Sequence, residues 1–241
     1  AVGGNAVGYD TSSTVPTVGS TISLVVAGPT GRLAMGRIQI NATKGGASYT
    51  PSAGPNTTLP GVISRSPYWC HCSPDLIGVG STNGFLYLLS PTLAVTWTYD
   101  GLADGRPAIN TTPAADANGD WYFGADDGHT YDVEIPMVGK QMFKAASFGP
   151  GGAIRSSPVV GGGADGCGSG PCLYFASATS GSYFVRLGAT RIIDLRACIS
   201  AASGSTTCAA NPRLWARVEV GLPAVVGAQG VYVQGWSYYS P

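Results

Sequence analysis

A five-residue segment that begins with isoleucine and ends with proline recurs along this chain and constrains its fold more than any other feature. It reads ISRSP at residues 63–67, INTTP at residues 109–113 and IRSSP at residues 154–158, with weaker copies ending at Pro16 and Pro223. The three clear prolines are 46 and 45 residues apart. Each precedes a short apolar run, and proline at the start of a β-strand costs no ladder hydrogen bond. The chain is therefore predicted to repeat one unit of short strands.

Two further positions recur in the same order within the units. A glycine precedes a strand that contains tyrosine or phenylalanine, and another aromatic residue follows late in the unit. The glycines are Gly31, Gly84, Gly128 and Gly181, and the late aromatics are Trp97, Phe143 and Trp215. We expect Trp97 and Trp215 to pack between neighbouring units, because a large ring buries more apolar surface than an aliphatic side chain. A period near 45 residues built of short strands is typical of a β-propeller, so the predicted fold is an all-β propeller of four-stranded antiparallel blades.

The recurring positions divide the chain into four complete units and part of a fifth. Residues 1–14 are predicted to be an N-terminal tail or closing strand, and residues 15–241 the propeller, with units at about 15–55, 62–103, 108–147, 154–220 and 221–241. Residues 41–60 are rich in Gly, Ser, Thr and Pro without clear periodicity, and we expect a loop there. Two arrangements stay open: a closed five-bladed ring, or part of a seven- or eight-bladed ring completed by a partner chain or by further sequence.

Two stretches resemble a known family. Residues 112–135, TPAADANGDWYFGADDGHTYDVEI, and residues 157–187, which contain SPVV and CLYFASATSGSYFVRL, resemble blades of quinoprotein-type propellers, the pyrroloquinoline-quinone repeat superfamily. The resemblance extends over about residues 15–236 and implies the fold. The superfamily includes alcohol dehydrogenases and many non-catalytic relatives. A catalytic member would need calcium held by carboxylate and amide ligands, a catalytic aspartate and a stacking tryptophan, and none of these roles can be assigned to a residue here.

Charge and hydropathy argue against two classes of partner. Lys and Arg together number 13, Asp and Glu together also number 13, and only 11% of the residues are charged. Such a balanced chain has no general electrostatic attraction for nucleic acid or for an anionic membrane. No apolar run approaches the roughly 18 residues that a membrane-spanning helix needs. Neither nucleic-acid binding nor membrane insertion is therefore predicted.

Six cysteines lie in three close pairs: Cys70 and Cys72, Cys167 and Cys172, and Cys198 and Cys208. Proximity favours these three disulfides among the 15 pairings that six cysteines allow, although Cys70 and Cys72 can also pair with cysteines of other units. Disulfides persist in oxidising compartments, so an extracellular, cell-surface or periplasmic location is predicted. The tripeptide Cys70-His71-Cys72 also offers soft ligands for copper or zinc, so a metal or redox role is the alternative there.

Three Asn-x-Thr sequons are candidates for glycosylation. Asn41 and Asn56 fall in the expected loop and are predicted to be modified. Asn110 lies too close to the start of a strand to be a good acceptor. Short sequons also arise by chance in a threonine-rich chain, so an unmodified asparagine is the alternative at each position.

One stretch shares a pattern with calcium-binding loops. Asp116, Asn118 and Asp120 carry side-chain oxygens at alternate positions, as the ligands of such loops do. A full calcium loop also needs a glycine after the third ligand, and Trp121 occupies that place. A hairpin turn is therefore the favoured interpretation, and a metal site is the alternative.

No catalytic or cofactor-binding residue is predicted. The chain has two histidines and no Gly-x-Ser-x-Gly motif, and its two glutamates, Glu134 and Glu219, are expected on exposed strand faces. The predicted function is that of a non-catalytic extracellular interaction or structural module, which binds a protein partner or assembles with neighbouring subunits through an exposed blade edge. The predicted contact residues are Tyr232, Trp236, Tyr238 and Tyr239. The alternatives are a fragment of a quinone- or metal-dependent oxidoreductase and a carbohydrate-binding, lectin-like propeller.

Overall fold

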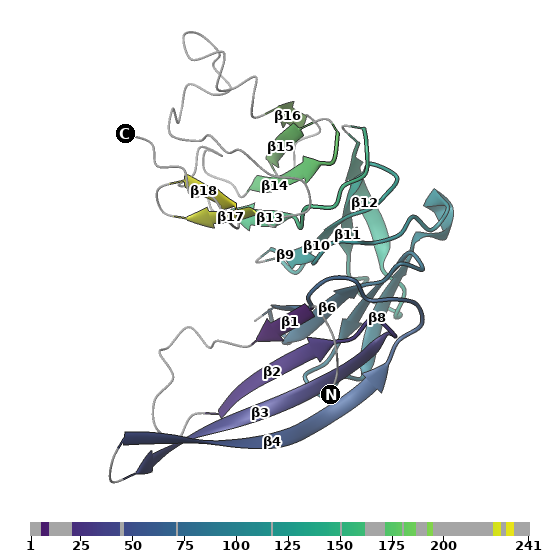
Figure 1. Cartoon of the computed structure of the whole chain (residues 1–241). Coiled ribbons are helices and arrows are strands. Elements are labelled where there is room, and N and C mark those ends of the chain that lie inside the picture. Colours follow the sequence, from purple (N-terminus) through teal and green to yellow (C-terminus); the bar gives the residue numbers. More distant parts are fainter. Residues whose placement is uncertain are drawn as a thin grey trace. The chain divides into compact units, whose positions relative to one another are not determined.

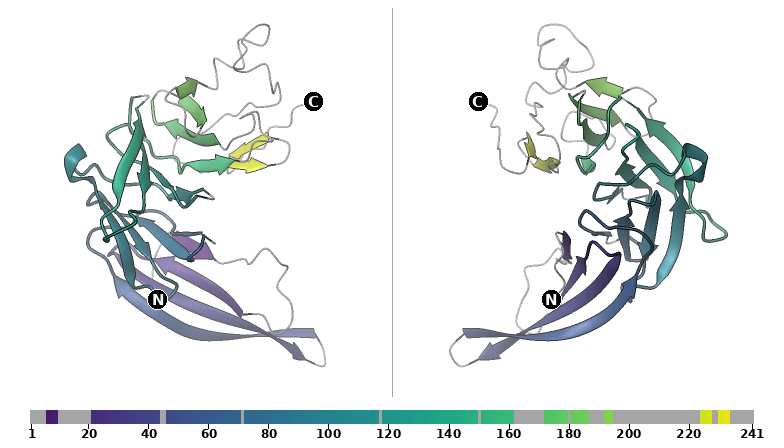
Figure 2. Two further views of the ribbon diagram at one scale, coloured as in Figure 1. Left: turned by 180° about the vertical axis from the view of Figure 1, so that it is seen from behind. Right: turned by 45° about the vertical axis from the view of Figure 1, so that its right-hand side comes forward.

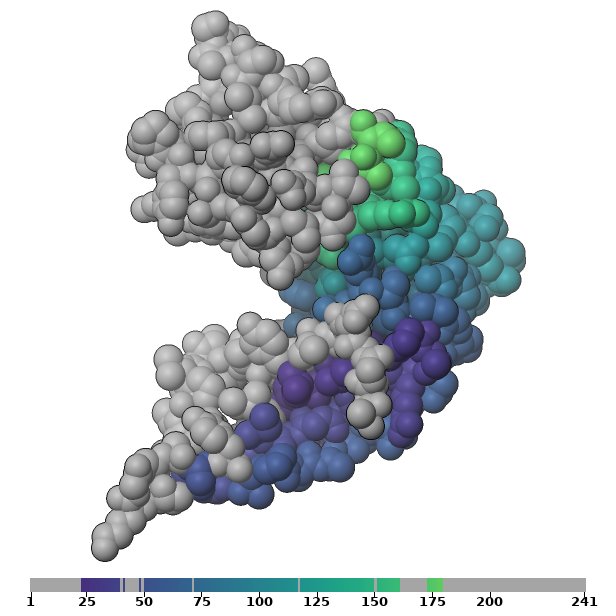
Figure 3. Space-filling model, viewed as in Figure 1, coloured from purple at the N-terminus to yellow at the C-terminus, as the bar shows by residue number. Residues whose placement is uncertain are grey.

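The computed structural model describes residues 6–9, 21–43, 46–70, 72–116, 118–149, 151–161, 172–179, 181–186, 192–194, 224–227 and 230–233. Side chains are described for fewer of these residues, and the others are grey in Figure 3. The chain divides into two compact units, Ala1–Thr112 with Ile135–Met142, and Pro113–Glu134 with Phe143–Pro241. Among the described residues, no helix is long and apolar enough to cross a membrane.

The described strands form four four-stranded antiparallel sheets and one two-stranded sheet, each in simple up-and-down order (Figure 1). The all-β prediction with four-stranded antiparallel blades is confirmed, whereas the closure of the ring and the unit boundaries stay predictions. The first sheet contains β1 (Ala6–Tyr9), β2 (Thr21–Ala27), β3 (Arg32–Thr43) and β4 (Gly46–Thr58). The second contains β5 (Tyr68–Cys70), β6 (Leu76–Gly80), β7 (Phe85–Leu89) and β8 (Val95–Asp100), and a 3-10 helix, η1 (Gly101–Asp104), follows it.

The remaining strands follow the same plan. The third sheet contains β9 (Ala114–Ala115), β10 (Trp121–Gly124), β11 (Thr130–Glu134) and β12 (Phe143–Phe148). The fourth contains β13 (Val159–Gly161), β14 (Cys172–Ser177), β15 (Gly181–Arg186) and β16 (Ile192–Asp194). The two-stranded sheet contains β17 (Ala224–Gly227) and β18 (Gly230–Val233).

The recurring prolines occupy equivalent places. Pro67, Pro113 and Pro158 each stand one residue before the first strand of a sheet, namely β5, β9 and β13. At this position the missing N–H of proline removes no ladder hydrogen bond. The repeat read from the sequence therefore corresponds to the repeat of sheets.

The recurring isoleucine holds each connecting segment against the preceding sheet through a backbone hydrogen bond and a buried side chain. Ile109 and Ile154 are 1% and 0% exposed, and each backbone N–H donates to a carbonyl just beyond the second strand of the preceding sheet, at 3.1 and 2.9 Å. Those second strands end at Gly80 and Gly124. A Cβ at either glycine would overlap the Cγ2 atom of the isoleucine. Glycine is required at both strand ends because a buried isoleucine side chain occupies the space.

Each unit has its own apolar core. In the first unit, buried residues of the first two sheets, including Val25, Leu33, Ile77 and Leu89, form one cluster, against which Trp69 and Phe85 pack. In the second unit, the third and fourth sheets meet through Tyr122, Phe148, Ile154, Leu173 and Phe175. Sheets that share a core in this way cannot bury their apolar faces alone.

The late aromatic residues are less buried than their recurrence indicates. Trp97 is only half-buried, and Phe143 is 48% exposed. The well-buried aromatic side chains of the outer strands are Tyr99 in β8 and Phe148 in β12, which are 5% and 6% exposed. Trp215 lies outside the described residues.

The expectation of a loop at residues 41–60 is wrong. β3 continues to Thr43 and β4 covers Gly46–Thr58, so the two strands form a long antiparallel ribbon that extends beyond β2 (Figures 1 and 2). β4 is the edge strand of its sheet, where its two prolines, Pro51 and Pro55, can be accommodated without breaking an interior ladder. Pairing with β3 determines this structure although the side-chain pattern of β4 does not alternate.

Candidate functional site

The structure places the predicted site residues in different parts of the chain. A disulfide joins Cys70 and Cys72. Cys172 begins β14, its side chain is not described, and Cys167, Cys198 and Cys208 lie outside the described residues. Of the predicted contact residues, Tyr232 lies in β18 without a described side chain, and Trp236, Tyr238 and Tyr239 lie outside the described residues.

Both predicted glycosylation sites lie on strands rather than in a loop. Asn41 is in β3, and its Nδ2 donates to Oγ1 of Thr50 at 2.9 Å. Asn56 is exposed on the edge strand β4. Asn110 is engaged with the neighbouring connecting segment, because its Oδ1 accepts from Ser64 Oγ at 2.7 Å. Glycosylation of Asn41 and Asn56 stays a prediction.

The candidate calcium loop forms a hydrogen-bonded hairpin turn between β9 and β10. Oδ1 of Asp116 accepts from the backbone N–H groups of Asn118 and Asp120 at 2.9 and 3.0 Å. Its Oδ2 accepts from Nδ2 of Asn118 at 3.4 Å and from the hydroxyl of Tyr122 at 3.3 Å. Asp116 is 8% exposed. Both carboxylate oxygens of Asp116 thus accept hydrogen bonds from the turn and from Tyr122. No group of three His, Cys, Asp or Glu among the described residues is arranged to hold a metal ion.

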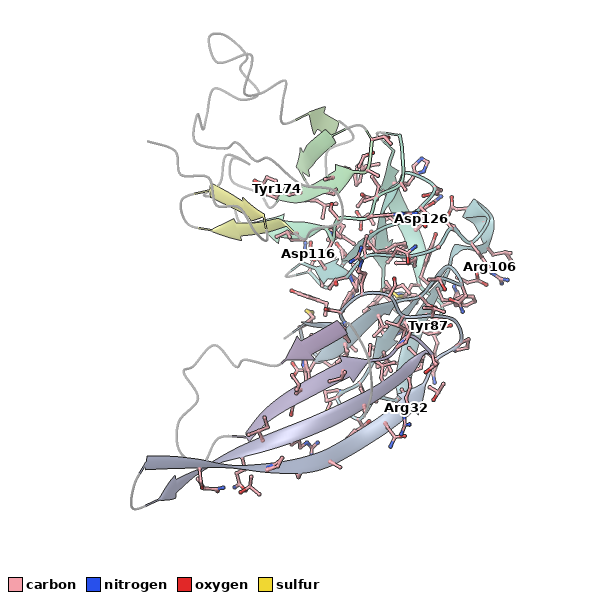
Figure 4. All side chains as sticks on the ribbon, viewed as in Figure 1. Arg32, Tyr87, Arg106, Asp116, Asp126 and Tyr174 are labelled. Atoms are coloured by element: carbon pink, nitrogen blue, oxygen red, sulfur yellow. A yellow bond between two sulfur atoms is a disulfide. The ribbon has the colours of Figure 1, made fainter. Side chains whose placement is uncertain are left out.

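The side chains of Tyr122, Asp132 and Glu134 share a face of the third sheet with this turn. Tyr122 in β10 pairs directly with Asp132 in β11. Side chains two residues apart on a strand point to the same side, so Asp120 and Glu134 extend this pair on the same face. Figure 4 labels Asp116 beside β9, at the end of β10 opposite to Asp126. The result is a carboxylate cluster at one end of the third sheet.

Burial raises the pKa of two carboxyl groups of this cluster, Asp132 and Asp120. Desolvation raises the pKa of Asp132 to about 7, with further contributions from Asp120, Glu134 and Asp116. Desolvation also raises the pKa of Asp120 to about 6, assisted by Asp116 and Glu134. The pKa of Tyr122 rises for the same reason, so its hydroxyl stays protonated and can donate to Asp116. Oδ1 of Asp132 is buried without a hydrogen-bond partner among the described residues.

Asp132 is not among the site residues predicted from the sequence. Glu134 is expected on an exposed strand face, but in the structure it is half-buried. Alternation along β11 could have placed Asp132 and Glu134 on one face. It could not show that this face is the one that approaches Asp120. That neighbourhood depends on the antiparallel register of β10 and β11.

A second set of side-chain hydrogen bonds recurs in the turns at the opposite end of the second and third sheets. The side-chain oxygens of Asn83 and Asp127 accept from the backbone N–H two residues later, at 3.2 and 3.0 Å, and the following glycines have φ of 85° and 90°. Four residues after each, a buried tyrosine hydroxyl contacts the same side chain. Nδ2 of Asn83 donates to Tyr87 at 3.1 Å, and Tyr131 donates to Asp127. These hydrogen bonds fix each turn, and Tyr87 and Tyr131 are also part of the core.

A loop between β11 and β12 forms the most unusual surface of the first unit. Residues Ile135–Met142 belong to that unit although the strands they join belong to the other. The backbone N–H of Thr98 donates to the carbonyl of Lys140 at 2.9 Å, and the N–H of Met142 donates to the carbonyl of Thr98 at 2.7 Å. The side chain of Met142 is 2% exposed. We call residues 135–142 the strap, since backbone hydrogen bonds and a buried side chain hold its end against β8.

The tip of the strap presents two apolar side chains to solvent. Met137 is fully exposed and Val138 is 89% exposed. The corresponding turn of the second sheet, between β7 and β8, instead buries its apolar residue: Leu93 is 2% exposed and belongs to the core. Exposure of Met137 and Val138 is therefore not a requirement of this kind of turn.

Comparisons with known proteins support the fold. No protein-family model and no curated protein matches the chain. Among solved structures, Sqt1 of Saccharomyces cerevisiae matches with a TM-score of 0.52 and 13% identity, over 81% of this chain and 48% of that one. BamB of Moraxella catarrhalis matches with a TM-score of 0.47 and 18% identity, over 70% and 44%. BBS1N, crystallised in complex with ARL6DN, matches with a TM-score of 0.47 and 12% identity, over 77% and 48%.

The chain spans about half the length of these proteins. At such low identity the likeness to Sqt1 concerns the fold alone. Together with the four-stranded antiparallel sheets, it identifies the described sheets as β-propeller blades.

Proposed function

We propose that this chain is part of a non-catalytic, quinoprotein-type β-propeller that works in an oxidising compartment outside the cytoplasm and binds a protein partner through the tip of the strap. The blade resemblance of residues 112–135 and 157–187 supports the family. The disulfide of Cys70 and Cys72 supports the compartment. Rigid blades that carry loops are a common scaffold for binding.

The exposure of Met137 and Val138 is the observation that carries the partner proposal. A protein that exposes large apolar side chains on a held loop is already arranged for contact, so little conformational entropy is lost on binding. Side chains of this kind serve as anchors when a partner provides a pocket for them. Lys140 is exposed in the strap, two residues after Val138, so a partner surface with an apolar pocket and an acidic group at its rim fits this contact.

Self-association through the outer edge of the first sheet is a weaker candidate for the function of this chain. β4 is one edge strand of this sheet, and its residues Pro51 and Pro55 have no backbone N–H with which to pair. Prolines on an edge strand are a common means of preventing edge-to-edge pairing. Pro136 also stands directly before the tip of the strap, but a contact made by the side chains of Met137 and Val138 needs no backbone N–H donor there.

The test compares the chain with a Met137→Ser/Val138→Ser variant. Full burial of two such side chains contributes about 3–6 kcal/mol, so the variant should bind at least roughly 100-fold more weakly. A partner is first captured from native material by the unaltered chain and then purified for Kd measurement against both proteins. Leu102→Ser is the matched control, because Leu102 is also an exposed apolar residue of the first unit, at 64%, and its loss should leave Kd unchanged. Equal affinities for all three proteins would contradict the proposal.

A further inference from the structure

The disulfide of Cys70 and Cys72 lies in the turn that joins β5 to β6. Cys70 is the last residue of β5 and pairs with Leu76, the first residue of β6. Only one residue separates the two cysteines, so the bridge closes a very small loop. The constraint that a disulfide places on the unfolded chain grows with the length of the loop it closes. This bridge is therefore close to the minimum that a disulfide contributes to stability in that way.

The corresponding turn of the third sheet shows that the fold closes this hairpin without a covalent bond. There, between β9 and β10, the backbone N–H of Asp116 donates to the carbonyl of Asp120 at 3.0 Å. The Asp116 carboxylate accepts two further backbone N–H groups of the same turn. Hydrogen bonds alone thus hold a first hairpin of the same repeat, so the repeat itself does not require a covalent bond at this turn.

The two sulfur-bearing residues differ in access. Cys70 is 7% exposed, whereas Cys72 is half-buried and reaches the surface. An external thiolate therefore meets Cys72 first. Thiol–disulfide exchange needs direct access of the attacking sulfur, and the outcome depends on which sulfur is attacked. This difference in residue exposure favours attack at Cys72 over attack at Cys70.

We propose that the Cys70–Cys72 bridge is a redox-responsive clasp on the β5–β6 turn, opened and closed by small thiols of the glutathione class. In the opening reaction an external thiolate attacks Sγ of Cys72, the bond to Sγ of Cys70 breaks, and Cys70 leaves with the electron pair and takes a proton. A second external thiol then attacks the mixed disulfide, releasing Cys72 as a thiol and the external pair as its disulfide. The protein gains two electrons and two protons, and the two external thiols are oxidised.

The experiment equilibrates the native, oxidised chain in a series of reduced and oxidised glutathione mixtures. Samples are quenched with acid and alkylated, and the peptide that contains Cys70 and Cys72 is analysed by mass spectrometry. We expect both residues to become alkylated under conditions that leave the circular dichroism spectrum and thermal midpoint unchanged. At short times the glutathione adduct should be at least ten-fold more abundant on Cys72 than on Cys70.

Three results would overturn the proposal. The first is a pair that stays oxidised in excess reduced glutathione while the protein is folded. The second is reduction of the bridge that coincides with unfolding of the protein, because the disulfide would then be needed to stabilise the fold. The third is an adduct mainly on Cys70. A Cys70→Ser/Cys72→Ser variant provides an independent check: it should keep the thermal midpoint of the native chain, and a large decrease would likewise show that the disulfide is needed to stabilise the fold.

Discussion

Replacing Gly80 with alanine isolates the contact by which the recurring isoleucine locks a connecting segment onto the preceding sheet. Gly80 does not have a positive φ, so alanine is opposed only by its surroundings. The new Cβ would overlap Cγ2 of Ile109, and the next atoms, Cβ of Ile109 and the carbonyl oxygen of Thr111, lie at 3.2 Å. Overpacking of this kind costs about 1–3 kcal/mol, partly offset by about 0.4–1 kcal/mol from the lower entropy of the unfolded chain.

The decisive variant combines this change with removal of the opposing side chain. Ile109→Ala alone should cost about 2–5 kcal/mol because Ile109 is fully buried and a cavity remains. In the Gly80→Ala/Ile109→Ala double variant, the added methyl group no longer meets Cγ2, so the double variant should be no less stable than Ile109→Ala alone.

Urea titration followed by circular dichroism gives the four free energies of unfolding for this double-mutant cycle. We expect a coupling energy of about 1–3 kcal/mol in favour of the double variant. Independent sites add to within about 0.5 kcal/mol. Simple additivity of the two substitutions would refute the explanation given for the glycine.

Three other predictions concern the polar groups. The raised pKa of Asp132 means that the folded state resists its ionisation, so stability should fall as pH rises from about 4 to 7; Asp132→Asn should raise the thermal midpoint at pH 8 and have much less effect at pH 4. Asp116→Ala should lower stability by about 1–3 kcal/mol because donors of a buried turn lose their acceptor, and added calcium should leave the thermal midpoint of the unaltered chain unchanged. Tyr131→Phe should cost about 1.5–3 kcal/mol and Tyr87→Phe about 1 kcal/mol, since Tyr131 donates to a carboxylate whereas Tyr87 contacts a neutral amide; equal losses in urea titrations would contradict this.

Features that depend on local backbone chemistry could be predicted from the sequence. Pro67, Pro113 and Pro158 mark strand starts because proline has few tolerated positions in a sheet. Gly84 and Gly128 mark turns that need a positive φ. The interpretation of residues 116–120 as a turn also rests on local propensity, and the hydrogen bonds of Asp116 agree with it.

Features that depend on distant partners could not be predicted. β4 has the composition of a loop, and only its ladder with β3 makes it a strand. The carboxylate cluster needs the register between β10 and β11, which the spacing of Asp120 and Asp132 does not reveal. The strap is held by Thr98, whose pairing with a loop of the next repeat has no signature in the sequence.

The lock formed by Ile109 and Gly80 also bears on how this chain should be divided for expression. A fragment that stops at the end of β8 contains every strand of the second sheet but leaves the space beside Gly80 uncovered. The first part of the first compact unit runs instead to Thr112, beyond the isoleucine and directly before Pro113. The repeating structural unit of this protein is thus offset from its sheets. Fragments that end directly before a recurring proline should be more stable than fragments that end at the last strand of a sheet.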